Sequence, residues 1–326
     1  MRVLWFVVLA AALAGCGLIG GSSPDPNLPK PVPTSAATPE PGEDAEAQAD
    51  LTVASFDMAA GLKAPPGIPD EEVAMNARLP VMANLLSPLG ADIIGLQGSD
   101  SSRPGESLGK ALGYATVQPF SSAPVLLGSG RFAVITSGSY PLLGDSELVW
   151  VRLREEATGQ TWYVFNTSLA LGDVNAEARL RQTMQVLDAM FEVDPELADP
   201  FVLLGDFGFD ANDEREEQLQ PLRMLEGAGM MDAGAVAAAS ISDVAGASSY
   251  HGMGELYEGK YYPKVVPLDG VRHDFVMVPT GSDVSGFGVI TGSAIEPATA
   301  HGTAVDRWQG PVASSHSPVV AKFTWS

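Results

Sequence analysis

Short apolar runs, most of them of strand length, recur along residues 51–326 between polar and glycine-rich segments. They predict strands at Leu51–Met58, Ala91–Gln97, Phe132–Thr136, Leu148–Arg154, Thr161–Leu169, Phe201–Leu204, Phe275–Val278 and Val319–Trp325. Near its start the strand Thr161–Leu169 has apolar residues at consecutive positions, such as Trp162 and Tyr163, which point to opposite faces. Both faces of that strand must therefore be covered. Two packed sheets with helices outside meet that requirement, and the pattern predicts a layered α/β sandwich.

Three segments have helical character, at 71–87, 176–191 and 216–227. The first opens on acidic residues and contains Pro80, which we expect to kink or split it. The second follows Asn175, a potential cap, and its apolar residues recur at helical spacing. This spacing predicts a buried face made of Leu180, Met184, Leu187 and Phe191. Residues 229–250, rich in Ala, Gly and Ser, give no clear assignment.

The N-terminus has the pattern of a signal peptide. Arg2 precedes the apolar residues 3–14, which are too few to span a bilayer, and the segment ends Leu13-Ala14-Gly15-Cys16. This ending resembles a bacterial lipobox, which would make 1–15 a lipoprotein signal peptide and Cys16 the acylated first residue of the mature chain. The alternative is an ordinary secretory signal with a chance cysteine. Residue 17 is Gly and not Asp, which resembles Gram-negative lipoproteins that are sent to the outer membrane. We therefore expect an extracytoplasmic, lipid-anchored protein, with the outer membrane favoured over the inner.

Residues 16–48 predict a disordered tether, because Pro, Ser, Gly and acidic residues dominate and too few apolar side chains are present to offset the ordering entropy. Its prolines favour extended conformations that suit a spacer between lipid and domain. The folded domain is predicted at 49–326.

Composition narrows the possible partners. The 326-residue chain is 45% hydrophobic, enough for a substantial core, and carries a formal net charge of -22. Such acidity disfavours nucleic acid as a partner, because affinity for a polyanion depends on Lys and Arg. A single cysteine excludes an internal disulfide, and the 4 histidines show no zinc-ligand spacing. No protein partner can be named from the sequence.

One run, Pro200 to Asp210, breaks from apolar residues onto Gly205-Asp206, as a buried strand does when it ends at a carboxylate. A carboxylate held rigidly at a strand end suits metal-assisted phosphate chemistry, although an Asp also simply turns a chain. Five further stretches follow the same design. They are Ser55-Phe56-Asp57, Leu96-Gln97-Gly98, Asn166-Thr167-Ser168-Leu169, Arg272-His273-Asp274-Phe275 and Ser314-Ser315-His316-Ser317-Pro318-Val319.

In order and spacing, these six stretches resemble the endonuclease/exonuclease/phosphatase superfamily over roughly Leu51 to Ser326. The resemblance implies a DNase I-like fold, a four-layer α/β sandwich of two packed mixed β-sheets flanked by helices. It also implies a metal-dependent phosphoesterase, with Asp206, Asp274 and His316 at catalytic positions and His316 as general acid or base.

Five positions depart from the family pattern. Asp57 stands for an Asn, Gly98 for the Glu that is a principal metal ligand, and Ser168 for a phosphate-binding His. Gly208 and Ser315 replace an Asn and an Asp. Without the carboxylate at position 98 a magnesium or manganese site loses its main ligand, and each missing phosphate donor typically costs about 10²–10³ in rate.

A displaced metal site remains conceivable from the sequence. Asp57 adds a carboxylate, and Asp100 would face the same way if the strand continued past Gly98. Whether Asp274 orients His316 in place of the missing Asp partner stays open at this point.

Three functional readings follow. The favoured one is a lipid-anchored domain with a degenerate phosphoesterase site that acts by binding or scaffolding. The alternative is an active phosphodiesterase or phosphatase, with Mg or Mn at a rearranged site that uses Asp57, Asp206, Asp274 and His316, acting on a small phosphate ester or lipid headgroup. A third places an unrelated site within 229–270, where tyrosines and charged residues cluster.

Overall fold

The structure, a computed structural model, describes residues 50–257, 259–292, 295–300 and 302–325. The predicted signal peptide and the tether, with Cys16, lie outside these residues. Within the described part, every helix is too short or too polar to cross a bilayer. The described residues form one compact unit.

The first sheet contains the strand that begins the domain. It has six strands, in the order β13 (Asp283–Val289), β16 (Val319–Thr324), β1 (Leu51–Asp57), β2 (Ile93–Gln97), β4 (Val125–Leu127) and β3 (Ala115–Val117). Strands β1 and β2 are parallel, and the other neighbours are antiparallel. The parallel pair brings the carboxyl ends of β1 and β2 to the same edge of the sheet.

The second sheet is also mixed. Its six strands follow the order β5 (Phe132–Pro141), β6 (Glu147–Glu155), β7 (Thr161–Ser168), β8 (Phe201–Asp206), β12 (Asp274–Pro279) and β9 (Met230–Asp232). Strands β7 and β8 are its one parallel pair among the described residues. Two separate hairpins complete the strands, β10 (Gly254–Tyr257) with β11 (Lys260–Pro263), and β14 (Ile295–Ala300) with β15 (Thr303–Trp308).

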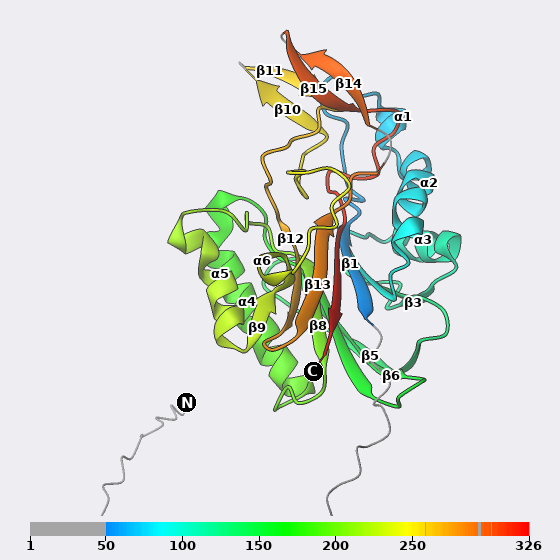
Figure 1. The fold of residues 1–326 in the computed structure, drawn as a ribbon, viewed down its shortest axis with the longest axis vertical. Helices are drawn as coiled ribbons and strands as arrows, with labels where there is room; N and C mark the ends of the chain where they lie inside the picture. Colours follow the sequence, from blue (N-terminus) through cyan, green and yellow to red (C-terminus); the bar gives the residue numbers. More distant parts are fainter. Residues whose placement is uncertain (1–49, 258, 293–294, 301, 326) are drawn as a thin grey trace, which may run out of the picture. The chain divides into compact units, whose positions relative to one another are not determined.

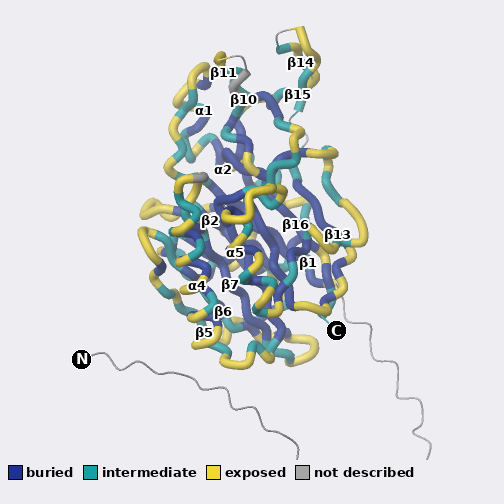
Figure 2. The backbone as a smooth tube through the Cα atoms, turned by 90° about the vertical axis from the view of Figure 1, so that its left-hand side faces the viewer, coloured by how far each residue is buried: buried dark blue, intermediate teal, exposed yellow. Residues whose placement is uncertain are grey.

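The sheets pack face to face, with helices on both outer faces, so the predicted four-layer sandwich is confirmed (Figure 1). Val53, Ile93, Val164 and Val202 belong to the core between the sheets. Figure 2 shows the buried residues concentrated along the strands. The helical segments are α1 (Asp70–Val73), α2 (Met75–Leu86), η1 (Ser87–Leu89), α3 (Pro104–Leu112), η2 (Asp173–Asn175), α4 (Ala176–Val193), α5 (Glu216–Gly227) and α6 (Ala233–Val236). Helices α2 and α3 cover the first sheet, and α4 and α5 cover the second.

The helix predicted at 71–87 is split, but not at Pro80. Pro80 lies inside α2, and the break falls at Ala74, which has extended backbone angles. Arg78 bridges this break, because its buried Nε donates to the carbonyl of Val73 at 2.8 Å. The remaining guanidinium nitrogens donate to the carbonyls of Met58, Ala59 and Ala313. Arg78 therefore ties the α1–α2 junction to the end of β1.

The buried face predicted for 176–191 is wrong. Helix α4 runs to Val193 and buries the face that contains Arg179, Gln182, Val186 and Met190, whereas Met184 is 52% exposed. Two of these buried residues are polar because they hydrogen-bond to the backbone of the loop after β7. Arg179 donates to the carbonyls of Ala170 and Gly172, and Gln182 accepts from the N–H of Ala170. Asn175 does not cap the helix; its side-chain amide donates to the carbonyl of Leu171.

A buried polar contact joins the two sheets near one end of their strands. The Gln97 amide donates to Asn166 Oδ1 at 2.6 Å, and Asn166 Nδ2 donates to the carbonyls of Leu96 and Ala123. A Cβ on Gly95 would collide with Asn166 and Leu204, so only glycine permits this close approach. The contact fixes the relative position of β2 and β7, whose ends flank the candidate site.

Candidate functional site

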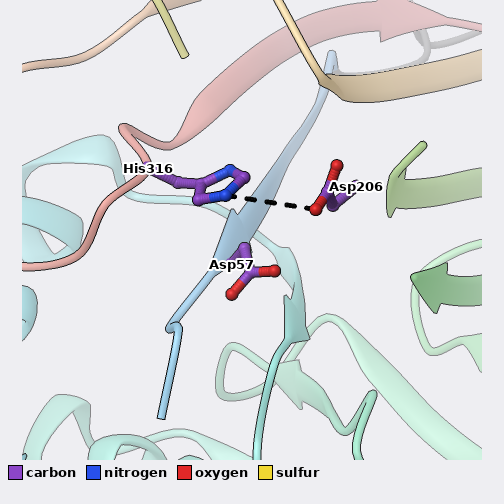
Figure 3. Close-up of side chains that lie close together, drawn as sticks. All are labelled: Asp57, Asp206 and His316. Atoms are coloured by element: carbon purple, nitrogen blue, oxygen red, sulfur yellow. Dashed lines mark ion pairs between the residues drawn. The ribbon is translucent and has the colours of Figure 1, made fainter. Parts of the chain in front are cut away.

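Three acidic or imidazole side chains converge where the two sheets meet. Asp57 ends β1, Asp206 ends β8, and His316 lies in the loop that leads into β16 (Figure 3). One ligand atom from each lies within 4.8 Å of the others, and His316 Nε2 is 4.0 Å from Asp206 Oδ2. All three are at most 6% exposed. We call Asp57, Asp206 and His316 the buried cluster.

Asp274 orients His316. It begins β12 directly opposite Asp206 in the antiparallel register, and its Oδ2 lies 3.0 Å from His316 Nδ1. A proton on Nδ1 shared with this carboxylate leaves Nε2 directed at Asp206. The structure therefore brings together the three residues predicted at catalytic positions, and it supplies the imidazole with a carboxylate partner although residue 315 is a serine.

Burial sets the electrostatics of the buried cluster. It raises the pKa of Asp57, and raises that of Asp206 well above its ordinary value, while the nearby His316 opposes both shifts. Burial alone would lower the pKa of His316, but Asp274, Asp57 and Asp206 together raise it to about 10. An imidazolium thus neutralises part of the carboxylate charge.

The Asp57 carboxylate occupies the space beside Gly98. A Cβ on residue 98 would overlap Asp57 Oδ1 and approach the backbone N–H group of Ala59 at 3.0 Å from its nitrogen. The same Oδ1 accepts from that N–H at 2.6 Å, so the carboxylate is held in place. Gly98 also has a φ of +62°, which disfavours any side chain. The Asp57 carboxylate therefore fills the space in which a side chain at residue 98 would begin.

The other departures from the family pattern surround the buried cluster. Ser168 ends β7 and pairs with Asp206 in the parallel register. Gly208 donates its N–H to Asp206 Oδ1 at 2.8 Å, and a Cβ on it would lie 2.6 Å from the Ala170 carbonyl oxygen. Ser315 is buried next to His316. None of these positions carries a cationic side chain that could bind phosphate.

The structure places Asp100 away from the buried cluster. Strand β2 ends at Gln97, and the chain turns at Gly98 instead of continuing as a strand. Asp100 is exposed, and its Oδ1 accepts from the backbone and hydroxyl of Ser102. Of the two metal-ligand candidates, only Asp57 belongs to the cluster.

Tyr250, which the sequence placed in a separate candidate site within 229–270, lies against the buried cluster. Its ring stacks on His273 at 4.6 Å between centroids and meets the ring of His316 edge-on at 5.0 Å. Its backbone also bridges to His316. The sequence signal for it was the clustering of tyrosines and charged residues in this segment. Residues 229–270 thus contribute to this site; Tyr250 and Tyr261 line a cleft of about 620 Å³ beside Gly208.

The donor set of the buried cluster is compatible with one divalent cation. Asp206 Oδ2 is buried and has no hydrogen-bond partner among the described residues. Two carboxylates with an imidazole held from behind by Asp274 form a common metal-binding arrangement, and Mn accepts imidazole more readily than Mg does. A proton on His316 would compete with the cation, because an imidazole nitrogen must lose its proton before it can bind a metal ion.

The chain matches no protein-family model and no curated protein. Solved structures share its fold. An endonuclease/exonuclease/phosphatase family protein from Bacteroides thetaiotaomicron matches with a TM-score of 0.61 and 16% identity, over 85% of this chain and 98% of that one. A mannosyl-6-phosphatase from the same species matches with a TM-score of 0.61 and 17% identity, over 84% and 100%.

The human Nocturnin catalytic domain, solved with a bound sulfate, matches with a TM-score of 0.56 and 13% identity, over 85% of this chain and 94% of that domain. At these identities the likeness establishes the fold. The DNase I-like architecture expected from the six strand-end stretches is therefore confirmed.

Proposed function

We propose that this protein is a lipid-anchored, extracytoplasmic domain with a phosphoesterase fold that acts by binding instead of hydrolysis. One observation carries the proposal: the Asp57 carboxylate fills the space beside Gly98, where the family's principal metal ligand would begin. A protonated His316, whose pKa the three surrounding carboxylates raise to about 10, would offset part of the carboxylate charge without a metal ion.

The surroundings of the buried cluster support this proposal. Hydrolysis of a phosphate ester needs donors or cations directed at the phosphoryl oxygens. Ser168, Gly208 and Ser315 offer no cation, and the adjoining cleft is lined by Asp210, Asp213 and Asp269 against the single Arg215. A phosphate that approached through this cleft would meet net negative charge.

A hydrolysis assay tests the proposal. Bis(p-nitrophenyl) phosphate and p-nitrophenyl phosphate are incubated with the protein and either Mg²⁺ or Mn²⁺, beside the variants Asp206→Asn and Asp100→Asn. We expect the same background rate from all three proteins. Metal-dependent turnover that Asp206→Asn abolishes and Asp100→Asn preserves would sink the proposal.

The anchor rests on Leu13-Ala14-Gly15-Cys16 and is tested separately. We expect the mature protein to begin at an acylated Cys16 and to sediment with outer membranes, because lipid chains partition into the bilayer. The variant Cys16→Ser should lack the lipid mass and leave the membrane fraction. An unmodified cysteine within a soluble mature chain would contradict the anchor.

A second function is favoured by Asp206 Oδ2, which is buried and accepts no hydrogen bond from the part of the chain that the structure describes. In this reading Asp57, Asp206 and His316 bind Mn²⁺ or Mg²⁺, and the domain hydrolyses a small phosphate ester or a lipid headgroup. The mannosyl-6-phosphatase with this fold makes a sugar phosphate one candidate substrate. Calorimetry decides the point: if neither cation binds in the millimolar range, or if Asp206→Asn binds as well as the unaltered protein, this function fails.

A further inference from the structure

The second sheet ends in a long strand with an open edge. Strand β5 forms one margin of this sheet, and its backbone pairs with β6 on one side (Figure 1). On its other side, no backbone group of β5 pairs with any residue that the structure describes. Gln118 donates to the Ser137 hydroxyl, but this contact joins two side chains and leaves the backbone edge open. Such an edge is a template on which a further strand can form hydrogen bonds.

The open edge of β5 lacks the charges that usually keep edge strands from pairing. Natural edge strands are commonly protected by charged side chains, whereas none of the 10 residues of β5 is charged. Its first half is also apolar and accessible, because Val134 is 46% exposed and Ile135 is 48% exposed. The register with β6 shifts at Ile135 and Pro141 ends the strand, so regular pairing on the open side is confined to residues 136–140.

The charge of the chain indicates which partner suits this edge. At a formal net charge of -22, two copies of the chain repel each other wherever their acidic surfaces meet, and β5 offers an uncharged line of contact. Antiparallel pairing of β5 with β5 of a second copy obeys a two-fold axis and is self-complementary. A pair centred on Gly138 places Thr136 opposite Tyr140 and Ser137 opposite Ser139 of the other copy. No two charged residues then oppose each other along the pair.

The two ends of β5 differ in charge in a way that favours this antiparallel arrangement. Arg152 and Arg154 of β6 lie beside the first half of β5, and their side chains are 40% and 53% exposed. Their present ion pairs are exposed, and such pairs contribute little. The exposed Asp145 follows the other end of β5, in the turn to β6. In an antiparallel pair the arginine end of each copy approaches the Asp145 end of the other, so these flanking charges attract.

We propose that β5 is a self-association edge, at which two copies of this chain pair antiparallel about a two-fold axis near Gly138 and join their second sheets into one continuous sheet. A single strand pair is smaller than a standard protein interface, so the association is reversible, with a dissociation constant between about 10 µM and 1 mM. The proposal does not rest on the proposed function, because the buried cluster lies at the ends of β1 and β8 and in the loop before β16, away from β5.

Sedimentation equilibrium of the full-length protein tests the proposal, in a density-matched mild detergent that keeps the apolar N-terminal segments apart. We expect the mass to rise from one chain towards two with increasing concentration. Ser139→Lys brings two positive charges close to the axis and should weaken association at least about tenfold. Thr299→Lys, at an exposed position of β14 in a separate hairpin, should leave association unchanged. Circular dichroism checks that both variants fold.

A cross-linking measurement does not depend on the lysine variants. In a Cys16→Ser background each introduced cysteine is the only one in the chain. A short bismaleimide should join two Ser139→Cys chains at least about tenfold faster than two Thr299→Cys chains, because pairing raises the effective concentration of the first thiol. The proposal is overturned if the mass stays that of one chain up to about 1 mM. It is equally overturned if Thr299→Lys weakens association as much as Ser139→Lys does, or if the two cysteine variants cross-link at the same rate.

Discussion

The carboxylate of Asp57 lies where the side chain of residue 98 would start, so the two positions exclude each other. Gly98→Ala adds a Cβ against that carboxylate at a φ of +62°. We expect it to lower the free energy of unfolding by about 3 kcal/mol, from backbone strain and overpacking together. Chemical denaturation measures the loss.

The control for that substitution is Gly90→Ala, because Gly90 has a similar φ of +56° and open space where its Cβ would stand. It should cost only the backbone strain, about 1 kcal/mol. In an Asp57→Ala background the cost of Gly98→Ala should fall towards this value. Equal costs in both backgrounds would show that the two residues do not compete.

Asp274 should contribute far more to stability than a surface carboxylate does. Asp274→Ala removes the carboxylate partner of the buried His316 imidazole, and breaking a buried pair typically costs 3–5 kcal/mol, so we expect a loss of about 4 kcal/mol. Glu177→Ala removes one partner of the exposed ion pair with Arg181 and should change stability by less than about 0.5 kcal/mol. Unfolding curves of the two variants that coincide would contradict the role given to Asp274.

Asn166 should hold the two sheets together beneath the site. Asn166→Ala leaves the carbonyls of Leu96 and Ala123 buried without that donor, and we expect a loss of about 3 kcal/mol in the free energy of unfolding. Asn212→Ala, which removes one exposed amide that donates to Gly270, should cost about 0.5 kcal/mol. A small effect at Asn166 would mean that apolar packing alone fixes the sheets.

Arg78 should stabilise the α1–α2 junction and the end of β1 through geometry as well as charge. Arg78→Lys keeps the charge but cannot reach four separated carbonyls, so we expect a loss of at least about 2 kcal/mol. Hydrogen exchange should quicken first around Met58 and Val73. Arg181→Lys, on the exposed face of α4, serves as the control and should leave exchange unchanged.

Tyr250 should shield His273 and His316 from reagents. Tyr250→Ala removes the ring stacked on His273, whereas Tyr250→Phe keeps it. We expect diethyl pyrocarbonate to modify His273 severalfold faster in Tyr250→Ala, and peptide mass spectrometry locates the adduct. The same rate in Tyr250→Ala and Tyr250→Phe would rule out shielding by the ring.

Much of the fold follows from local pattern. The strands around Phe165, Leu204 and Val276 are apolar on consecutive positions because both of their faces are covered, and that is visible in the sequence. Strands β3 and β4 have three residues each, too few for a period to be recognised. Strand β13 contains Gly286 and Gly288, which pack closely against the chain around Ile241, a reason that only the tertiary structure reveals.

The sequence predicted those site residues that lie next to a recognisable strand, and it did not predict features that depend on loop conformation or tertiary contacts. Asp206 and Asp274 meet because they lie opposite each other in the β8–β12 pair, and the loop before β16 brings His316 against Asp274. The orientation of Asp100 depended on whether a strand continued past Gly98, which a backbone angle decides. The buried face of α4 was mispredicted because Arg179 and Gln182 satisfy loop carbonyls and N–H groups that no periodicity reveals.

The contact between Gln97 and Asn166 separates the architecture of this domain from its chemistry. The sheets are joined by an amide pair that takes no part in the buried cluster, so changes at positions 98, 168, 208 and 315 need not loosen the junction. A substitution at one of these positions therefore leaves the hydrogen bonds that join the sheets in place, whatever it costs locally. For the same reason the domain is a practical starting point for engineering, since new metal-binding side chains can be introduced at the site while the Gln97–Asn166 contact beneath it is kept.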